Sequence, residues 1–536
     1  MTADAPMRWW GWAEPDHPIE VSAAGEALLR SEIGLGDAVT PPVALEDVRL
    51  PDPRPLPELG GVELRQDRET RVRHAAGRSY PDLVRLRSGD GSGAPDAVVY
   101  PGSEDEVAAM IAACDAAGVA VVPFGGGTSV VGGVEALHGA HSAAIALDLR
   151  RLDSLTVDRS SLTATMGAGL PGRRAEARLQ GRGLTLGHFP QSFEFGSVGG
   201  YVATRSAGQA STGYGRADEM VVGLRCVAPA GTLVAKPVPA TAAGPSLLQL
   251  LVGSEGAFGA ITEATLAVRL LPATRRYEGW SFKSFEAGCA AFRAIEQGHV
   301  APDVARLSDE HETRMAMAMS SHGGVAERLG RAYLRARGHE GGCIAIVGWE
   351  GEEGQAARRA ADTRRVLRAE GGLSLGTSPG QSWLRARYLG PYQRDKLLGR
   401  GAFAETLETA TTWSNLGSLH RAVGDALREA LGARGTPALV ACHVSHLYPS
   451  GASLYFTFLA RAQRGEELEQ WAAAKRAAME AIVASGGTIT HHHAVGRDHA
   501  EWLREEIGDL GVDALRAVKD RLDPRGIMNP GKLLPG

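Results

Sequence analysis

Three consecutive histidines, His491, His492 and His493, are the residues of this chain best suited to proton transfer. An imidazole has an unperturbed pKa of ~6.5, so it can take up a proton and return it near neutral pH. An extended backbone would place His491 and His493 on one face and His492 on the other. We therefore expect a multi-part acid–base site. A transition-metal site or a solvent-exposed patch would also suit the run, but no Cys, Asp or Glu stands at metal-ligand spacing nearby, and we expect no metal.

A second candidate for chemistry is a glycine-rich loop. Residues 119–122 form an apolar run, and Gly125, Gly126 and Gly127 follow after only two further residues. A backbone without side chains can curl tightly and direct its N–H groups at an anion. Upstream, the pair Ser103 and Glu106 and the later Gly118 mark the start and end of a helix. The pattern predicts a helix, a strand and then an anion-binding loop.

The loop fits neither of two common phosphate-binding motifs. A Walker loop ends in Gly-Lys-Ser/Thr, and a Rossmann fingerprint has G-x-G-x-x-G between a strand and a helix. Here Thr128 and Ser129 follow the glycines without a lysine, and the next residues are apolar and glycine-rich. For an isolated triplet of this kind, a surface turn is the alternative interpretation.

Two further glycine-rich segments, residues 191–208 and 253–263, change that interpretation. Together the three segments resemble the flavoprotein family of vanillyl-alcohol oxidase and p-cresol methylhydroxylase. The histidine run with Ala494-Val495-Gly496, and the segment 523–532, resemble the alkyldihydroxyacetonephosphate synthase branch of that family. The resemblance extends from about residue 75 to the C-terminus, and 523–532 is its last matching segment.

The resemblance implies an α+β fold with a two-part FAD-binding domain of the p-cresol methylhydroxylase type and a separate α+β cap domain for the substrate. Short strand-like runs at 143–147 and 162–166 alternate with a helical segment at 172–180, which agrees with this class. The expected parts are an N-terminal extension, the FAD-binding domain, the cap domain and a C-terminal segment that completes the active site and the FAD domain; their bounds are 1–90, 91–271, 272–480 and 481–536.

The implied cofactor is FAD, whose pyrophosphate needs backbone N–H and hydroxyl donors. Many relatives attach FAD through a histidine or cysteine, in one branch within the first loop. Residues 125–129 contain neither, so we expect non-covalent FAD. Arg205 could supply charge, whereas Glu194 and Glu255 could instead be structural caps or ion-pair partners. The implied cofactor-binding residues are Pro123, Phe124, Gly125, Gly126, Gly127, Thr128, Ser129, Gln191, Ser192, Phe193, Glu194, Phe195, Gly196, Ser197, Thr204, Arg205, Ser206, Ala207, Glu255, Gly256, Ala257, Phe258, Gly259, Ala260 and Ile261.

The resemblance also implies three residues at the substrate. Tyr455 matches a catalytic tyrosine, Arg394 a phosphate-binding arginine, and Arg306 an arginine essential for activity. Arginine suits a phosphate because its donors can bind two oxygens at once. Without the resemblance, Tyr455 would be an ordinary strand aromatic and the arginines surface residues. The chain has His443 where the family has an arginine, and it lacks a family proline before Trp413, so the alcohol and its chain length stay open.

The implied reaction exchanges the acyl group of an acyl-dihydroxyacetone phosphate for a long-chain fatty alcohol by way of a flavin N5 adduct, without net oxidation. One of the three histidines would remove the proton from C1. The alternative is an FAD-dependent oxidase or dehydrogenase of a 2-hydroxy acid such as lactate or glycolate, in which Arg306 and Arg394 hold a carboxylate. A flavin-retaining binding protein without turnover is a third possibility.

Composition limits the partners and the compartment. With 536 residues, 44% of them hydrophobic, the chain can build two or three domains, and its net charge of −5 gives no electrostatic reason to bind nucleic acid. The five scattered cysteines suggest a reducing cytoplasm, and abundant Arg, Ala and Gly suggest a bacterial source. No run reaches the ~18–20 apolar residues of a membrane span. We expect transient membrane-surface contact to collect lipid substrates and, from the resemblance, a homodimer. The early tryptophans Trp9, Trp10 and Trp12 should cover apolar surface of the body or of a partner subunit.

Overall fold

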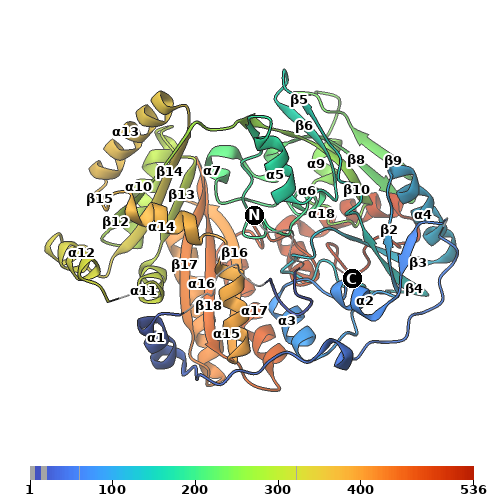
Figure 1. Ribbon diagram of the computed structural model, residues 1–536, viewed down its shortest axis with the longest axis horizontal. Coiled ribbons are helices and arrows are strands. Elements are labelled where there is room, and N and C mark those ends of the chain that lie inside the picture. The colour runs from blue at the N-terminus through green and yellow to red at the C-terminus, as the bar shows by residue number, and fades with distance from the viewer. Residues whose placement is uncertain (1–6, 14–20, 60, 322, 536) are drawn as a thin grey trace.

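The computed structural model describes residues 7–13, 21–59, 61–321 and 323–535. In these residues the strands form four sheets, and the helices pack around them in two lobes that lie side by side (Figure 1). We call the part built on strands β1 to β10 the first lobe. The second lobe is built on one seven-stranded sheet that begins with β12.

The first sheet of the first lobe carries the glycine-rich loop. Its strands β2, β4 and β3 are parallel, and every residue of β2 and β4 is buried, as expected for parallel strands covered on both faces. The strand order is β1 (Glu63–Arg65), β2 (Ala97–Tyr100), β4 (Ala143–Asp148) and β3 (Val119–Phe124).

Helix α4 (Glu104–Ala117) precedes β3 and follows the predicted pattern. The Ser103 hydroxyl accepts a hydrogen bond from the amide of Glu106, and Gly118 ends the helix in a left-handed conformation with φ 66°. The predicted capping box is only half formed, because the Glu106 carboxylate accepts from the Gly102 amide at 2.6 Å.

The second sheet of the first lobe is antiparallel. Its order is β5 (Leu155–Asp158), β6 (Thr163–Gly167), β10 (Ala260–Ala267), β8 (Val221–Ala228) and β9 (Gly231–Ala235). A short pair joins β7 (Leu184–Thr185) to β11 (Arg269–Leu270). The helices of this part are α5 (Gly172–Gln180), α6 (Val198–Ala203), α7 (Ser211–Tyr214), α8 (Ala217–Met220) and α9 (Leu247–Leu251).

The sheet of the second lobe is antiparallel. Its order is β15 (Leu373–Ser374), β12 (Thr274–Phe282), β14 (Cys343–Gly351), β13 (Val304–Ser308), β17 (Leu439–Tyr448), β18 (Gly451–Arg461) and β16 (Ala402–Thr412), so β16 is an edge strand. Its helices are α10 (Phe285–Gln297), α11 (Glu310–Met319), α12 (Val325–Ala336), α13 (Glu353–Ala369), α14 (Ser378–Ala386), α15 (Gly390–Gly399), α16 (Leu416–Ala433) and α17 (Glu467–Ala484).

The C-terminal residues return to the first lobe. After η2 (Ala500–Trp502) and α18 (Leu503–Leu522), the chain runs along the free edge of β3. The amide of Val121 donates to Ile527 O at 2.8 Å, and the amide of Asn529 donates to Val121 O at 2.8 Å. The end of the described chain is therefore fixed beside the glycine-rich loop that follows β3.

The N-terminal residues also pack against the lobes. They form α1 (Ala23–Ile33), η1 (Leu45–Asp47), α2 (Arg68–Arg73) and α3 (Tyr80–Arg87). Trp9 and Trp12 are buried against the rest of the chain. One hydrophobic cluster extends from Val99 of β2 to Phe456 of β18, so the two lobes share a core. Among the described helices, none has the length and apolar character needed to cross a bilayer.

Candidate functional site

The three histidines are held by one carboxylate of β16. Glu408 Oε2 accepts from the amide of His491 at 2.5 Å, and Oε1 accepts from the amides of His492 at 3.0 Å and His493 at 2.8 Å. Oε1 also accepts from the Thr490 hydroxyl at 2.7 Å. Glu408 is only 2% exposed. Four donors thus converge on one buried anion.

The expectation of an extended strand through the histidines is wrong. Residues 491–493 form a bend between α17 and η2. Consecutive amides in a strand point in opposite directions, so three of them can reach one carboxylate only when the backbone curls. The rings therefore stay together, with centroids 5.2 Å apart for His491 and His492 and 4.7 Å apart for His492 and His493.

The hairpin of β17 and β18 brings three more rings to this cluster. Tyr455 lies nearly parallel to His492 at 6.1 Å and edge-on to His493 at 5.5 Å. His446 stacks on His491 at 5.0 Å, and the Tyr448 hydroxyl lies 2.7 Å from His491 Nε2. The structure thus brings the predicted Tyr455 together with the predicted histidines.

Sequence reasoning missed Glu408, His446 and His188 as site residues. His188 Nε2 lies 3.1 Å from the Ser206 hydroxyl. Burial lowers the pKa of His188, and the nearby His492 lowers it further. Two signals were available, because His188 lies three residues before the second glycine-rich segment and His446 shares a strand with His443. Glu408 offered none, since it meets the histidines only through the fold.

Burial fixes the charge states of the cluster. It lowers the pKa of His491 and His492 below the usual range and that of His493 to about 3, so the rings are neutral at neutral pH. For Glu408, burial favours the protonated form, but the three imidazoles, which carry positive charge once they are protonated in acid, and the amide of His492 outweigh burial and hold the pKa well below normal. Neutral rings beside an anion can accept a proton, as a general base must.

Arg306 reaches the cluster only through other side chains. It lies on β13, where Nη2 pairs with Glu312 at 2.8 Å and Nη1 lies 3.0 Å from His443 Nε2. His443 in turn stacks on Tyr455 at 4.8 Å. Burial raises the pKa of Glu312, but Arg306 and His443 outweigh it and lower the pKa overall. His443 occupies the position where the family has an arginine. It contacts both Arg306 and Tyr455 and so connects them.

Arg394, unlike Arg306, acts on His493 and Tyr455 through its charge. It is on α15, and its Nη2 donates to Arg78 O at 2.8 Å, while its Nε is buried without a protein acceptor. Burial raises the pKa of Tyr455, and the charge of Arg394 opposes that rise. Arg394 also helps to lower the pKa of His493. A cation with an unused buried donor therefore lies within electrostatic reach of the acid–base groups, as an anionic substrate would require.

The first two glycine-rich segments fit directly against each other. A Cβ on Gly126 would lie 1.9 Å from Phe195 O, and one on Gly125 would lie 2.2 Å from Ser197 Oγ. Gly127 has φ +65°. The loop after β3 therefore cannot carry side chains at these positions.

The third segment holds the histidine loop. Glu255 Oε1 accepts from the amide of Val495 at 2.8 Å, and Oε2 accepts from that of Gly496 at 2.7 Å. Burial raises the pKa of Glu255 to about 7. Glu194 accepts from the Tyr392 hydroxyl at 2.9 Å. Both carboxylates thus bind protein groups, the structural role left open above.

The predicted charge of Arg205 is directed elsewhere. Its Nη2 donates to Gln249 O at 3.0 Å, and its Nη1 lies 3.4 Å from Asp218. Three other buried polar atoms near the glycine-rich segments have no protein partner: Tyr201 OH, Ser254 Oγ and Asn529 Oδ1. Such atoms, together with the bare loop, fit a bound group rich in donors and acceptors. The other predicted cofactor residues lie in the same three segments.

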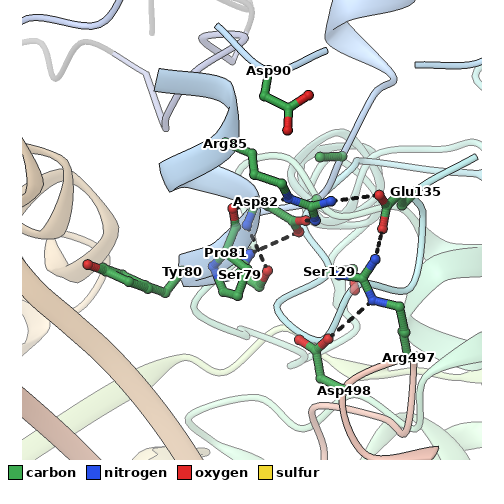
Figure 2. Close-up of polar contacts among 12 residues, drawn as sticks. Ser79, Tyr80, Pro81, Asp82, Arg85, Asp90, Ser129, Glu135, Arg497 and Asp498 are labelled. Atoms are coloured by element: carbon green, nitrogen blue, oxygen red, sulfur yellow. Dashed lines mark hydrogen bonds and ion pairs between the residues drawn. The ribbon is translucent and has the colours of Figure 1, made fainter. Parts of the chain in front are cut away.

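A chain of ion pairs links α3 and the segment after the glycine-rich loop to the histidine loop (Figure 2). Asp82 pairs with Arg85 at 3.0 Å, and Arg85 pairs with Glu135 at 2.7 Å. Glu135 also accepts from Arg497, whose Nε lies 3.7 Å from Asp498. Arg497 and Asp498 follow the histidines after three residues. The network therefore joins α3, the segment after the loop and the end of the histidine turn.

One group in the described chain has the geometry of a metal site. His446, His491 and His492 offer ring nitrogens that all lie within 4.8 Å of one another. No carboxylate joins them, because Glu408 is occupied by amides. The absence of a bound metal stays a prediction.

Comparison with known proteins places this site in context. Residues 95–235 match the family described as an FAD binding domain, and residues 271–533 match the C-terminal domain of FAD linked oxidases. The chain is 35% identical to the alkyldihydroxyacetonephosphate synthase of Trypanosoma brucei brucei over 486 residues, which cover 89% of this chain and 79% of the relative.

Solved structures give the same result. A structure of alkyldihydroxyacetonephosphate synthase superposes with a TM-score of 0.85 at 28% identity and covers 98% of this chain and 99% of its own. A structure of p-cresol methylhydroxylase with substrate bound shares the fold, with a TM-score of 0.65 at 14% identity over 88% of this chain and 93% of its own. The comparisons confirm the expected fold class and FAD as the cofactor.

The first prediction concerns the loop after β3. Gly126→Ala would drive a Cβ into Phe195 O, and overpacking of this kind costs ~1–3 kcal/mol, or up to roughly 100-fold in affinity. We expect purified Gly126→Ala to lose most of its bound FAD, measured as the ratio of flavin to protein absorbance. Gly36→Ala, where nothing lies within 4 Å of the new Cβ, is the control and should keep its FAD. Equal FAD content in both variants would contradict the close approach of the two segments.

The second prediction concerns Glu408. Glu408→Gln replaces one acceptor oxygen by a donor that faces an amide, so we expect about 3 kcal/mol less stability at neutral pH in urea unfolding. Because folding lowers the pKa of Glu408, its stabilising effect is complete above the unfolded value of ~4.3 and is lost as the pH falls through the folded pKa. The difference between the two proteins should therefore narrow in acid. Exposed Glu505→Gln is the control, and a constant difference at all pH values would refute the assignment.

Proposed function

The chain belongs to the alkyldihydroxyacetonephosphate synthase family, and we propose that it exchanges the acyl group of an acyl-dihydroxyacetone phosphate for a long-chain fatty alcohol. The observation that carries the proposal is the set of neutral imidazoles beside Tyr455 and Arg394. Such a set combines proton transfer with recognition of a phosphate monoester.

The side chains divide the work as follows. Arg394 binds the substrate phosphate, and one imidazole of the cluster accepts the C1 proton and later returns it. When bound, FAD supplies an electron-accepting ring that ends as oxidised as it began. The bond between C1 and the ester oxygen breaks, and the fatty acid leaves as a carboxylate. The alcohol oxygen then bonds to C1 and gives its proton to the cluster, where Tyr455 and the Tyr448–His491 pair can pass it on.

The alternative, oxidation of a 2-hydroxy acid, has less support in the geometry. In that reaction Arg306 and Arg394 would both hold the substrate carboxylate. Arg306 instead pairs with Glu312 and contacts His443. His443 therefore lies between Arg306 and the cluster of His491, His492 and His493. The family membership favours the exchange reaction as well.

Three finer points belong to the proposal. FAD is bound without a covalent link, because residues 125–129 contain no histidine or cysteine. The protein works in a bacterial cytoplasm, in keeping with five free cysteines, four of them buried. The protein forms a homodimer, which rests on the family resemblance.

Contact with a membrane surface is supported by α12. Val325, Leu329 and Tyr333 follow one another at four-residue intervals and are 66%, 65% and 44% exposed, so they form one apolar stripe. The helix stands at the outer edge of the second lobe (Figure 1). It also carries Arg328, Arg331 and Arg335. An apolar stripe flanked by arginines suits an anionic lipid surface, where the substrates reside.

The exchange itself gives the third prediction. Incubation with palmitoyl-dihydroxyacetone phosphate and labelled hexadecanol should place the label in an alkali-stable phosphate lipid, because an ether resists alkali and an ester does not. We expect His492→Ala and Tyr455→Phe to lower the rate by ~100-fold or more. The exposed variant Glu505→Gln should keep the wild-type rate. Persistent flavin bleaching by lactate or glycolate, without labelled ether, would instead identify the oxidase.

The fourth prediction concerns α12. Leu329→Glu should reduce co-sedimentation with phosphatidylglycerol vesicles by about tenfold, because a carboxylate must leave water to enter the interface. The control is Leu510→Glu on α18, which alters a side chain that is 82% exposed on another helix. If both variants bind vesicles like the wild type, α12 is not the contact surface.

A further inference from the structure

Residues 7–13, which we call the strap, cross between α15 and the turn before α3. The amide of Trp12 donates to Asp395 Oδ2 of α15 at 2.5 Å. On the other side, the Arg78 guanidinium donates to Gly11 O at 2.9 Å through Nε and to Arg8 O at 2.8 Å through Nη2. The strap thus connects a helix of the second lobe with a residue just before α3.

Aromatic packing fixes the same segment. Trp12 is 4% exposed and lies edge-on to Phe195 with ring centroids 5.1 Å apart. It also packs in one cluster with Tyr392 of α15. Phe195 belongs to the second glycine-rich segment, and its carbonyl faces Gly126. The strap therefore touches the FAD-binding loops and α15 at once.

Arg78 links the strap to Arg394. Its carbonyl accepts from Arg394 Nη2 at 2.8 Å, and its amide donates to Ser129 O at 2.6 Å. Its own guanidinium is 2% exposed and bonded to backbone carbonyls. Without the strap, this buried cation would lose two acceptors. Asp395, the neighbouring carboxylate, would then be the next partner within electrostatic reach.

The strap also stabilises the charge of Asp395. Burial raises the pKa of this carboxyl, and the Trp12 amide, Arg394 and Arg87 oppose the rise. Asp395 Oδ1 and Arg394 Nε are both buried without a hydrogen-bond partner. Asp395 Oδ1 and Arg394 Nε can therefore each form one more hydrogen bond, whereas Asp395 Oδ2 already accepts from the Trp12 amide of the strap.

We propose that the strap positions Arg394 for the phosphate of the substrate. It does so by holding Asp395 with the Trp12 amide and by binding the Arg78 guanidinium with the Gly11 and Arg8 carbonyls. The inference rests on the proposed function, which supplies the phosphate. Gly11 is required for this contact, because a Cβ there would lie 2.4 Å from Asp395 Oδ2. None of the strap side chains transfers a proton, so the strap is a positioning element.

Two variants test the strap. Gly11→Ala forces it away from Asp395, and Asp395→Asn keeps the volume of the side chain while it removes the charge. The matched controls are Gly36→Ala, whose new Cβ would have nothing within 4 Å, and Glu505→Gln, which changes an exposed carboxylate. We expect both test variants to raise KM for palmitoyl-dihydroxyacetone phosphate by about tenfold. KM for hexadecanol and the FAD content should stay at the wild-type values, as should all three quantities in Gly36→Ala and Glu505→Gln.

The outcomes separate the two proposals. If the wild-type enzyme forms no ether lipid, the proposed function is wrong. An active wild type whose Asp395→Asn variant keeps KM for the phosphorylated substrate would overturn the strap proposal. So would equal increases in both KM values or a parallel loss of FAD, because a merely structural strap would produce these. If Gly11→Ala does not fold, Asp395→Asn alone decides.

Discussion

The site depends on a single buried carboxylate whose charge is stabilised by hydrogen bonds from backbone amides. Glu408 belongs to the edge strand of the second lobe, and the histidines belong to a turn that leads back to the first lobe. Because the carboxylate binds the amides of three successive residues, the side-chain rings of those residues are also held close together. Burial then keeps the rings neutral, and neutral imidazoles are the form that can remove a proton.

Several weaker contacts place this turn relative to the FAD-binding loops. Glu255 holds the two amides after the histidines, and the chain of ion pairs through Glu135 reaches Arg497. The strap performs a similar task on the opposite side, between α15 and Phe195. Elements from both lobes therefore surround the histidine cluster and Arg394. Such a site is rigid because each loop is fixed at more than one point.

Local patterns in the sequence predicted the parts governed by neighbouring residues. Ser103 and Gly118 bound α4 as expected, and the three glycines after β3 have no room for side chains. Contacts between distant residues could not be predicted in this way. Glu408 lies 83 residues before His491, and Trp12 lies 383 residues before Asp395. The strand expected through the histidines was wrong for the same reason, since the distant carboxylate decides the backbone path.

The charge state of the imidazoles tests the account most directly. Nitrogen-15 spectra of the protein labelled at histidine, assigned with single His→Gln variants, report whether each ring carries one proton or two. The account predicts that His491, His492 and His493 each carry a single ring proton at neutral pH. A doubly protonated ring at any of these positions at neutral pH would contradict it, because that ring could not act as the base beside the Glu408 anion.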